Sequence, residues 1–353
     1  MNKKIGFIYY TFYPVRGGAS VHGYNLAREL KKLGYDLYKL NGEPDPWTTK
    51  LSGSLSGLLW ILKNCDVIYV RMDHFITQPR NLIGLISLLI GKKVIVELNN
   101  PSDELYLFGR GKRYIRFVDR LYRLFLSRAR AVIVVSEPLK TYCKQVLGLQ
   151  RTYVIENGGE IFDPDSINPS EEIRLKMETI RHRFDSVVVW AGSMNEMQEL
   201  EWVREFAREA GSDMAVLFIV NDEGGNHRQS GSPEEDNIFI FRNPGRQDVK
   251  FLILSADAGL AFYKPYPWSR WGYYNSSLKI YEYLNNGLLT FTNIRGTDSQ
   301  LHSSFFRNVD SPEQAVEQIR NRRHMKFSAA VGTRTWDQVA QETARVIEEV
   351  IEK

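Results

Sequence analysis

The sequence has 353 residues, of which 43% are hydrophobic and 25% are charged, and this composition excludes a disordered or fibrous chain. The length suits roughly two domains, while two cysteines and six histidines, which show no zinc-ligand spacing, exclude a disulfide framework and a Cys/His metal site. The net charge of +4 is unevenly spread, because residues 1–165 carry 24 Lys and Arg against 15 Asp and Glu and the remainder is acidic.

Short β-branched and aromatic segments alternate with segments of helical periodicity through the first half of the chain. Strands are predicted at 5–10, 67–70, 94–98, 131–135 and 153–155, and helices near 19–33, 82–90, 113–126 and 139–147. The predicted strands are almost continuously apolar, which is typical of a parallel sheet covered by helices on both faces.

The same alternation resumes after a polar stretch at 163–169, which we interpret as a linker. Strands are predicted at 187–191, 214–220, 238–241, 258–262 and 288–292, and helices near 199–209, 249–254, 278–284 and 336–351. We therefore predict two Rossmann-like α/β domains, residues 1–165 joined by the C-terminal helix 336–353, and residues 170–335.

A glycine pair, Gly17 and Gly18, lies between the first predicted strand and the first predicted helix. Glycines allow a ligand to approach the backbone, and the following helix N-terminus offers free amides and a positive dipole to a phosphate. The alternative is a tight turn without a ligand, because the spacing is not that of the dinucleotide fingerprint.

The segment 275–287 follows a predicted strand and opens a helix that ends at Gly287. Lys279 and Glu282 are three residues apart and therefore share one helical face near its N-terminus, next to Ser277. That face suits a nucleotide, with Lys279 and backbone amides on the phosphates and Glu282 accepting both ribose hydroxyls. The alternative is a solvated Lys–Glu pair on an ordinary amphipathic helix.

These motifs and their separation resemble the GT-B glycosyltransferases, specifically the retaining family 4 group, over nearly the whole chain. The strand and serine at 132–136, the Asn157-Gly158 hinge and the helix at 278–287 are similar to elements of that family. The resemblance implies an α/β fold in which two Rossmann-like domains face each other across a cleft and the C-terminal helix crosses back to the first domain.

The resemblance implies transfer of a sugar from a nucleotide-diphosphate donor to a glycan or lipid-linked acceptor. It also implies retention of anomeric configuration, no metal and no other cofactor. The residues that we assign to donor binding are Gly17, Gly18, Ser193, Ser277, Leu278, Lys279 and Glu282. A nucleotide-sugar epimerase of GT-B fold and a non-catalytic nucleotide-sugar-binding subunit are the alternatives.

Several positions depart from the family pattern and affect the catalytic assignment. Tyr274 stands where many members carry an acid, residues 191–196 contain no Arg or Lys for the diphosphate, and residues 96–101 lack the frequent histidine. We therefore assign the catalytic roles to Lys279, Arg270 and Asn99, because preorganised cations and polar groups can stabilise a leaving diphosphate.

The acceptor is assigned to Glu97, Asp73 and His74, which follow or end predicted strands, where open α/β sheets bind ligands. A solvated loop histidine is the alternative for His74. The aromatic residues in 263–274 could stack on a sugar or a base, or pack against their own domain.

The segment 110–130 holds eight basic residues and one acid, with aromatic and aliphatic residues between them. Such a helix can lie on an anionic membrane surface or approach a lipid-linked acceptor, and the alternative is a solvated basic helix. No nucleic-acid partner is expected, since no recognition motif accompanies the charge. The residues assigned to the membrane surface are Arg113, Arg116, Arg120 and Arg123.

Two apolar runs bear on the location of the protein. The run at 5–13 is followed by Pro14 and not by a small-residue cleavage site, so we expect a buried strand and no secretory signal. The run at 82–90 is too short to span a bilayer. We expect a cytoplasmic protein, either free or peripherally attached at the inner membrane face.

Overall fold

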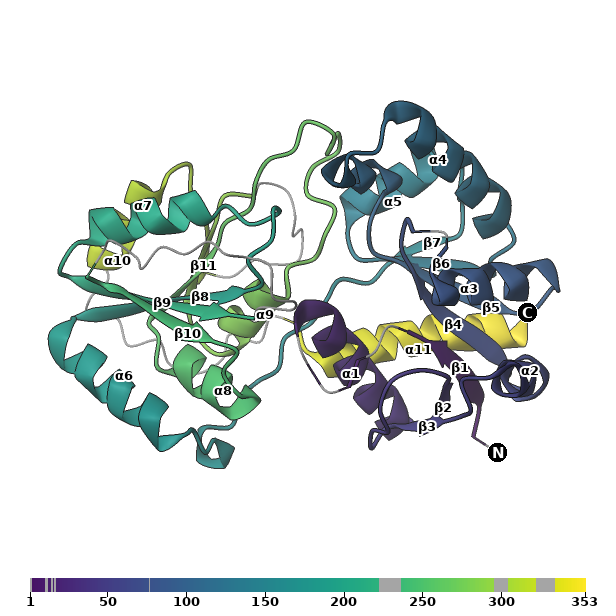
Figure 1. Cartoon of the computed structure of the whole chain (residues 1–353), viewed down its shortest axis with the longest axis horizontal. Coiled ribbons are helices and arrows are strands. Elements are labelled where there is room, and N and C mark those ends of the chain that lie inside the picture. Colours follow the sequence, from purple (N-terminus) through teal and green to yellow (C-terminus); the bar gives the residue numbers. More distant parts are fainter. Residues whose placement is uncertain are drawn as a thin grey trace. The chain divides into compact units, whose positions relative to one another are not determined.

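The computed structural model describes residues 2–9, 12, 13, 15, 17–75, 77–221, 236–294, 304–321 and 334–353. The chain divides into two compact units, which are shown in Figure 1. Unit 1 comprises Met1–Asn157, Tyr266–Ser276 and Trp336–Lys353, and unit 2 comprises Gly158–Pro265 and Ser277–Thr335.

The described residues of unit 1 form a seven-stranded parallel sheet in the order β3-β2-β1-β4-β5-β6-β7. Its strands are β1 (Lys4–Ile8), β2 (Asp36–Lys39), β3 (Thr48–Lys50), β4 (Val67–Met72), β5 (Val94–Leu98), β6 (Ala131–Val134) and β7 (Thr152–Val154). Every residue of β5 is buried, which explains its apolar pattern, interrupted by the buried Glu97.

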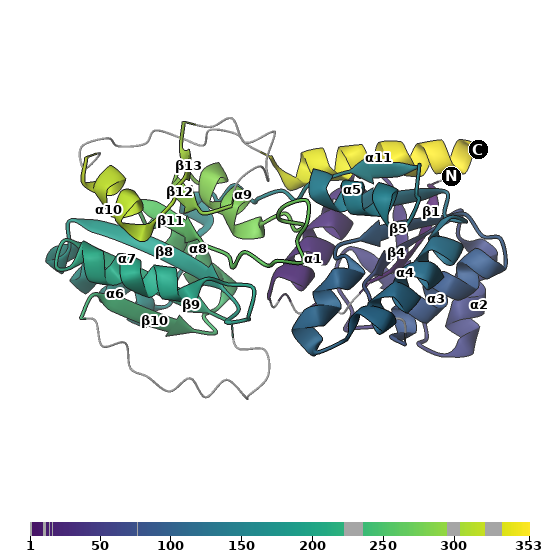
Figure 2. The same cartoon turned by 90° about the horizontal axis from the view of Figure 1, so that it is seen from above.

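Helices cover both faces of this sheet. On one face, α1 (Gly17–Lys32) packs beside the C-terminal helix α11 (Trp336–Glu352), as Figures 1 and 2 show. The other face carries the main hydrophobic core, to which α2 (Leu55–Asn64), α3 (Pro79–Leu89), α4 (Lys112–Leu126) and α5 (Glu137–Gln145) contribute. The return of the C-terminal helix to the first unit is thereby confirmed.

The described part of unit 2 forms a six-stranded parallel sheet in the order β10-β9-β8-β11-β12-β13. Its strands are β8 (Ser186–Gly192), β9 (Met214–Val220), β10 (Ile238–Arg242), β11 (Ala258–Ala261), β12 (Leu289–Thr292) and β13 (Phe306–Asn308). Its helices are α6 (Glu171–Arg183), α7 (Leu200–Ala210), α8 (Arg246–Leu254), α9 (Leu278–Asn285) and α10 (Pro312–Arg320). Separate hydrophobic clusters pack α7 and α10 on one face and α6 and α8 on the other.

The strands and helices predicted from the sequence are all present, and the prediction of an α/β fold with parallel sheets is confirmed. Several elements were missed: β2, β3, α2, α6, β13 and α10. The missed strands are three or four residues long, and α6 buries only Met177 and Ile180 on an otherwise charged helix. The hydrophobic signal of these strands and of α6 was therefore weak, whereas α2 and α10 bury apolar residues at helical spacing and were overlooked.

The polar stretch 163–169 contains a short 3-10 turn, Pro164–Ser166, in which the Asp163 side chain accepts from the amide of Asp165. It lies inside unit 2, since that unit begins at Gly158.

The aromatic segment Tyr266–Ser276 packs within unit 1. Tyr274 is 3% exposed and joins the main core of that unit, with Trp268 and Trp271 packed against the same core. Ser136 Oγ donates a 2.6 Å hydrogen bond to the Tyr274 carbonyl. These aromatic side chains therefore stabilise unit 1 and not residues 170–335, to which the sequence had assigned them.

Candidate functional site

Most of the residues predicted to bind the donor lie at the start of α9 in unit 2. Ser277 precedes the helix with an extended backbone, and its hydroxyl hydrogen-bonds the Tyr263 hydroxyl. Leu278 is the first residue of the helix and Lys279 is the second. Lys279 Nζ lies 3.1 Å from the position that a Cβ of Gly192 would take, so this amine lies at the carboxyl end of β8, and Ser193 follows Gly192 in the chain.

Lys279 sits in an aromatic environment. Its Nζ lies 4.4 Å from the centre of the Trp190 ring and 5.3 Å from that of Tyr263, and it donates a 2.9 Å hydrogen bond to Gln198 Oε1. Among the described residues no carboxylate is paired with it. Burial lowers the pKa of Lys279 to about 7, so this amine can take up a proton when an anion binds beside it.

This shift predicts a pH effect on stability. The pKa of a lysine in an unfolded chain is about 10.4, so between pH 7 and pH 9 the unfolded chain binds the extra proton and stability rises with pH. A Lys279→Met variant lacks this dependence, so the difference in unfolding free energy between wild type and variant should change by about 2 kcal/mol in favour of the wild type. Thermal unfolding of both proteins at pH 7, 8 and 9 measures it, and parallel pH profiles would contradict the lowered pKa of Lys279.

Glu282 does not pair with Lys279. Arg246 Nη2, at the start of α8, donates to Glu282 Oε1, and the same nitrogen lies 3.1 Å from Glu160 Oε2. Lys250 Nζ donates to the other oxygen of Glu160 at 2.7 Å. The alternative of a solvated Lys279–Glu282 pair is therefore wrong, because each side chain has a different partner within unit 2.

Unit 1 holds a second polar cluster at the carboxyl ends of its strands. Glu97, 1% exposed at the end of β5, accepts a 2.6 Å hydrogen bond from the Tyr69 hydroxyl and a 3.1 Å bond from Asn99 Nδ2. Its Oε1 lies 3.4 Å from Arg71 Nη1 and 3.3 Å from His22 Nε2.

Burial acts to raise the pKa of Glu97, but the charges of His22 and Arg71 and the hydrogen bonds from His22 and Tyr69 hold this pKa well below its usual range. The carboxylate is therefore an ionised group that holds protein donors in place. Asn99, which the sequence predicted as catalytic, is one of the groups it orients.

The sequence analysis missed His22. This side chain is 4% exposed on α1, and its Nδ1 lies 2.6 Å from Asn157 Oδ1 while its Nε2 faces Glu97. Asn157 in turn donates from its backbone and side-chain nitrogens to Ser276. Both ring nitrogens of His22 therefore face oxygen acceptors. The available signal was a polar stripe that α1 buries at helical spacing, at His22, Asn25 and Glu29.

His74 is 2% exposed, so the alternative of a solvated loop histidine is wrong. Its Nδ1 lies 3.6 Å from Glu104 Oε2, and among the described residues neither ring nitrogen has a hydrogen-bond partner. Burial lowers the pKa of His74 to about 4 and raises that of Glu104 to about 7. The neighbouring Asp73 accepts from the Asn81 side chain at 2.7 Å and pairs with Arg80.

The remaining predicted residues lie in unit 1. Arg270 Nη2 is 3.4 Å from Asp103 Oδ2, and its guanidinium lies over the Trp271 ring. Gly17 and Gly18 form the first turn of α1. In unit 2, Ser277, Leu278, Lys279 and Glu282 lie at or on α9 and Ser193 follows β8, while in unit 1 Glu97 contacts Asn99. Asp73 and His74 stand in a separate group, and Arg270 has its own partner.

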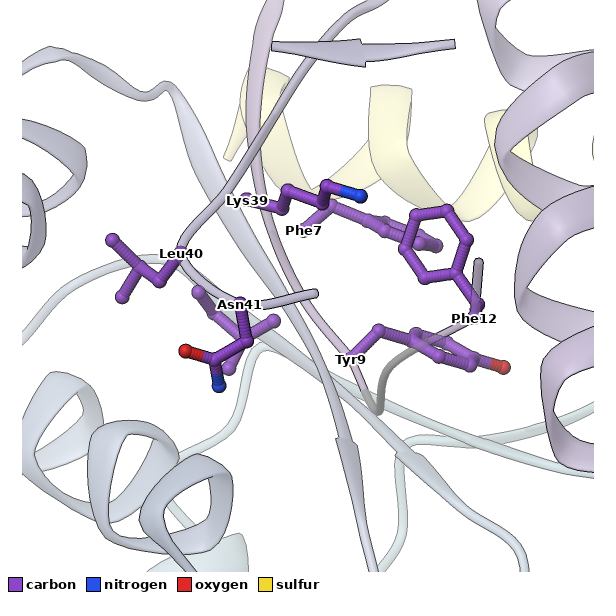
Figure 3. Close-up of a pocket in the computed structure, with 7 residues that line it drawn as sticks. Phe7, Tyr9, Phe12, Lys39, Leu40 and Asn41 are labelled. Carbon is purple, nitrogen blue, oxygen red and sulfur yellow. The ribbon is translucent and has the colours of Figure 1, made fainter. Parts of the chain in front are cut away.

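A small cavity also lies at the carboxyl ends of β1 and β2, lined in part by Tyr9, Phe12 and Lys39 (Figure 3). Its volume of about 10 Å³ suits at most one water molecule. Lys39 lies over the Phe12 ring and donates to Asp45 at 2.5 Å, so its charge is balanced within unit 1. This cavity is too small for a sugar.

The helix α4 is strongly amphipathic. It buries Ile115, Val118, Tyr122 and Leu126 and exposes its basic residues, which include Arg113, Arg116, Arg120 and Arg123. Phe117 and Leu124 are also exposed, by 56% and 55%.

Within the described ranges, no helix has the length and apolar character needed to cross a membrane. In the same part of the chain, His, Cys, Asp and Glu side chains form no group of three or more that could hold a metal ion.

No protein-family model matches the chain, and no curated protein sequence matches it. Solved structures do match. Sucrose-phosphate synthase from Thermosynechococcus elongatus is 12% identical with a TM-score of 0.68, and the match covers 99% of this chain and 100% of that one. Anabaena HepE in complex with UDP-glucose is 15% identical with a TM-score of 0.63, covering 99% and 98%.

A putative UDP-N-acetylglucosamine 2-epimerase from Listeria monocytogenes is also similar, at 11% identity and a TM-score of 0.55, covering 99% of this chain and 96% of that one. At this level of identity the likeness concerns the fold alone. Two parallel sheets flanked by helices, matched over nearly the whole length of these proteins, show that the chain has the GT-B fold.

Proposed function

We propose that the chain is a glycosyltransferase that moves a sugar from a nucleotide-diphosphate donor to a glycan or lipid-linked acceptor. The observation that carries the proposal is the arrangement on α9, where a half-buried amine and an ion-paired carboxylate stand on the first turns of one helix. In support, a structural neighbour of the same fold is a complex with UDP-glucose.

The donor would bind unit 2 through its ribose and its diphosphate. Glu282 would accept the ribose hydroxyls, and Lys279 with the free amides of the first turn of α9 would bind phosphate oxygens. Ser193 and Ser277 would add neutral donors. The contribution of Gly17 and Gly18 from unit 1 stays a prediction.

The reaction breaks the bond between the anomeric carbon and the diphosphate oxygen, and this oxygen leaves with the electron pair. The acceptor hydroxyl bonds to the anomeric carbon and gives its proton to the departing diphosphate. Lys279, charged once phosphate is bound, would stabilise the leaving diphosphate without a metal. Asp73 and His74 are proposed for the acceptor, and Arg270 and Asn99 for assistance near the reacting atoms. Retention of configuration is part of the proposal.

Incubation with a panel of nucleotide sugars and candidate acceptors tests the proposal, with free nucleoside diphosphate and glycosylated product measured together. We expect both products in the presence of EDTA. The epimerase neighbour makes epimerisation the second candidate, and an epimerised sugar with no transfer product would favour it. Tight donor binding without either product would indicate a binding subunit.

We further propose that unit 1 contacts an anionic membrane surface through α4, as a peripheral cytoplasmic protein engaged in polysaccharide synthesis. The exposed arginines of α4 would lie near lipid phosphates. Each basic residue near the membrane surface contributes about 1 kcal/mol to the binding free energy at low salt. The adjacent α3 exposes Leu82, Ile86 and Leu89, so apolar surface lies next to the basic surface.

Liposome binding tests this surface. Wild-type protein is expected to bind vesicles of phosphatidylcholine with phosphatidylglycerol at low salt and to dissociate as salt screens the charge. Replacing Arg113, Arg116, Arg120 and Arg123 with Gln should weaken binding at least about tenfold. Replacing Arg174, Arg181, Arg204 and Arg208 of unit 2 with Gln is the matched control. Equal loss in both variants, or no binding by wild type, would refute the membrane contact.

A further inference from the structure

The partner of Glu282 is itself held in a chain of alternating charges. Lys250 pairs with Glu160, Glu160 with Arg246, and Arg246 with Glu282. Lys250 and Arg246 are one turn apart on α8, while Glu160 lies in the segment before α6 and Glu282 lies on α9. Three parts of unit 2 therefore meet at Arg246.

Packing and hydrogen bonds fix this chain in place. The Arg246 guanidinium and the Lys250 ammonium lie over the Phe162 ring, at 5.4 and 5.1 Å from its centre. Asn286 ties the segment to α9, since its Nδ2 donates to the Glu160 carbonyl at 2.9 Å and its Oδ1 accepts from the amide of Phe162 at 2.8 Å. A side chain braced from both sides loses little entropy when a ligand binds.

Opposite charges keep Arg246 and Glu160 ionised. Burial acts to lower the pKa of Arg246, but Glu282 and Glu160 outweigh it and raise this pKa. Burial likewise acts to raise the pKa of Glu160, but Arg246 and Lys250 lower it. The two cations are balanced by two carboxylates, so Arg246 does not need a phosphate to satisfy its charge.

Of the two carboxylate oxygens of Glu282, one accepts a hydrogen bond from Arg246 and the other has no such bond from the described residues. Arg246 donates to Oε1, and no described residue hydrogen-bonds Oε2, on a side chain that is 16% exposed. A free glutamate on a helix surface would sample several rotamers, whereas this one is held at a single oxygen.

We propose that Arg246 is a positioning residue for Glu282, which fixes the carboxylate so that Oε2 faces the ribose and thereby sets the preference for ribonucleotides over deoxyribonucleotides. This inference rests on the proposed function, in which Glu282 accepts the ribose hydroxyls. Arg246 acts through Glu282 and does not itself need to touch the ligand.

The test is the ratio of dissociation constants for a nucleoside diphosphate and its 2′-deoxy analogue, measured by calorimetry. Wild type is expected to prefer the ribonucleotide about tenfold or more, the effect of one charge-assisted hydrogen bond. Arg246→Ala should weaken binding of the ribonucleotide about tenfold and binding of the deoxy analogue about twofold or less, so that the ratio of dissociation constants falls toward one. Arg246→Lys, which retains a cation, should restore part of the ratio.

A double-mutant cycle with Glu282 distinguishes a positioning role of Arg246 from a general structural role. In the Glu282→Ala background, Arg246→Ala should have no further effect on the ratio. Arg181→Ala is the matched control, because Arg181 forms a comparable pair with Asp257 in the same unit. Arg246→Met keeps the apolar stem over Phe162 and should behave like Arg246→Ala if that variant unfolds.

An unchanged ratio in folded Arg246→Ala or Arg246→Met would overturn the inference, as would an equal loss of both ligands. If wild-type protein binds no nucleoside diphosphate at all, the proposed function fails and the positioning role falls with it. If wild type binds but does not distinguish the two sugars, the assignment of Glu282 to the ribose is the part that is wrong.

Discussion

Glu282→Ala is expected to weaken nucleoside diphosphate binding by about 10- to 100-fold, because the ribose hydroxyls lose a charge-assisted acceptor worth about 1.5–3 kcal/mol. The loss includes a second contribution, since removal of the carboxylate leaves Arg246 with Glu160 as its remaining acidic partner among those described. The measurement is the dissociation constant by calorimetry, with the fold checked by circular dichroism.

Glu178→Ala is the control for this variant. Glu178 lies on α6 in the same unit, is 52% exposed in its side chain, and pairs with Arg174 at the surface. Its removal should leave affinity unchanged. Wild-type affinity in folded Glu282→Ala would show that the carboxylate does not hold the ribose.

Lys279→Ala is expected to reduce turnover by about 100- to 1,000-fold, the usual effect of removing one donor from a developing oxyanion. Binding of a nucleoside monophosphate should fall far less, because charge on the leaving diphosphate grows most in the transition state. Steady-state kinetics and calorimetry on the same preparations give the two quantities.

Lys176→Ala is the matched control, since Lys176 also lies over an aromatic ring of unit 2, Phe241, but on α6. It should retain wild-type turnover. Equal losses of turnover and monophosphate affinity in Lys279→Ala would make Lys279 an ordinary binding residue, which would leave the leaving-group role unassigned.

The sheets were predictable because their strands are buried on both faces. The strands predicted at 94–98 and 214–220 coincide with β5 and β9, in which every residue is buried. The amphipathic helices were equally clear, as α4 and α11 show through their buried stripes. Short edge strands such as β3 and the charged helix α6 carry too little apolar periodicity to be found this way.

The site was predictable only where its residues are close in the sequence. Lys279 and Glu282 share one helix, so their spacing indicated a common face. Their partners Gln198 and Arg246 lie on other elements, separated by 81 and 36 residues. No sequence periodicity links such positions.

The same limit applies to unit 1. Glu97 and Asn99 were singled out together, but the contact of Asn157 with His22 spans 135 residues and forms only when α1 packs beside the end of the sheet. The burial of His74 was likewise invisible from the sequence, because Glu104 and Phe108 reach it from the segment after β5.

Titration of the purified chain with UDP, GDP, ADP, CDP and dTDP by calorimetry in EDTA tests the account most directly. We predict that at least one of them binds with one-to-one stoichiometry, raises the thermal unfolding temperature, and loses most of its affinity in Glu282→Ala while keeping it in Glu178→Ala. Absence of binding by all five, at millimolar concentration and with the fold intact, would contradict a nucleotide-sugar donor site on α9.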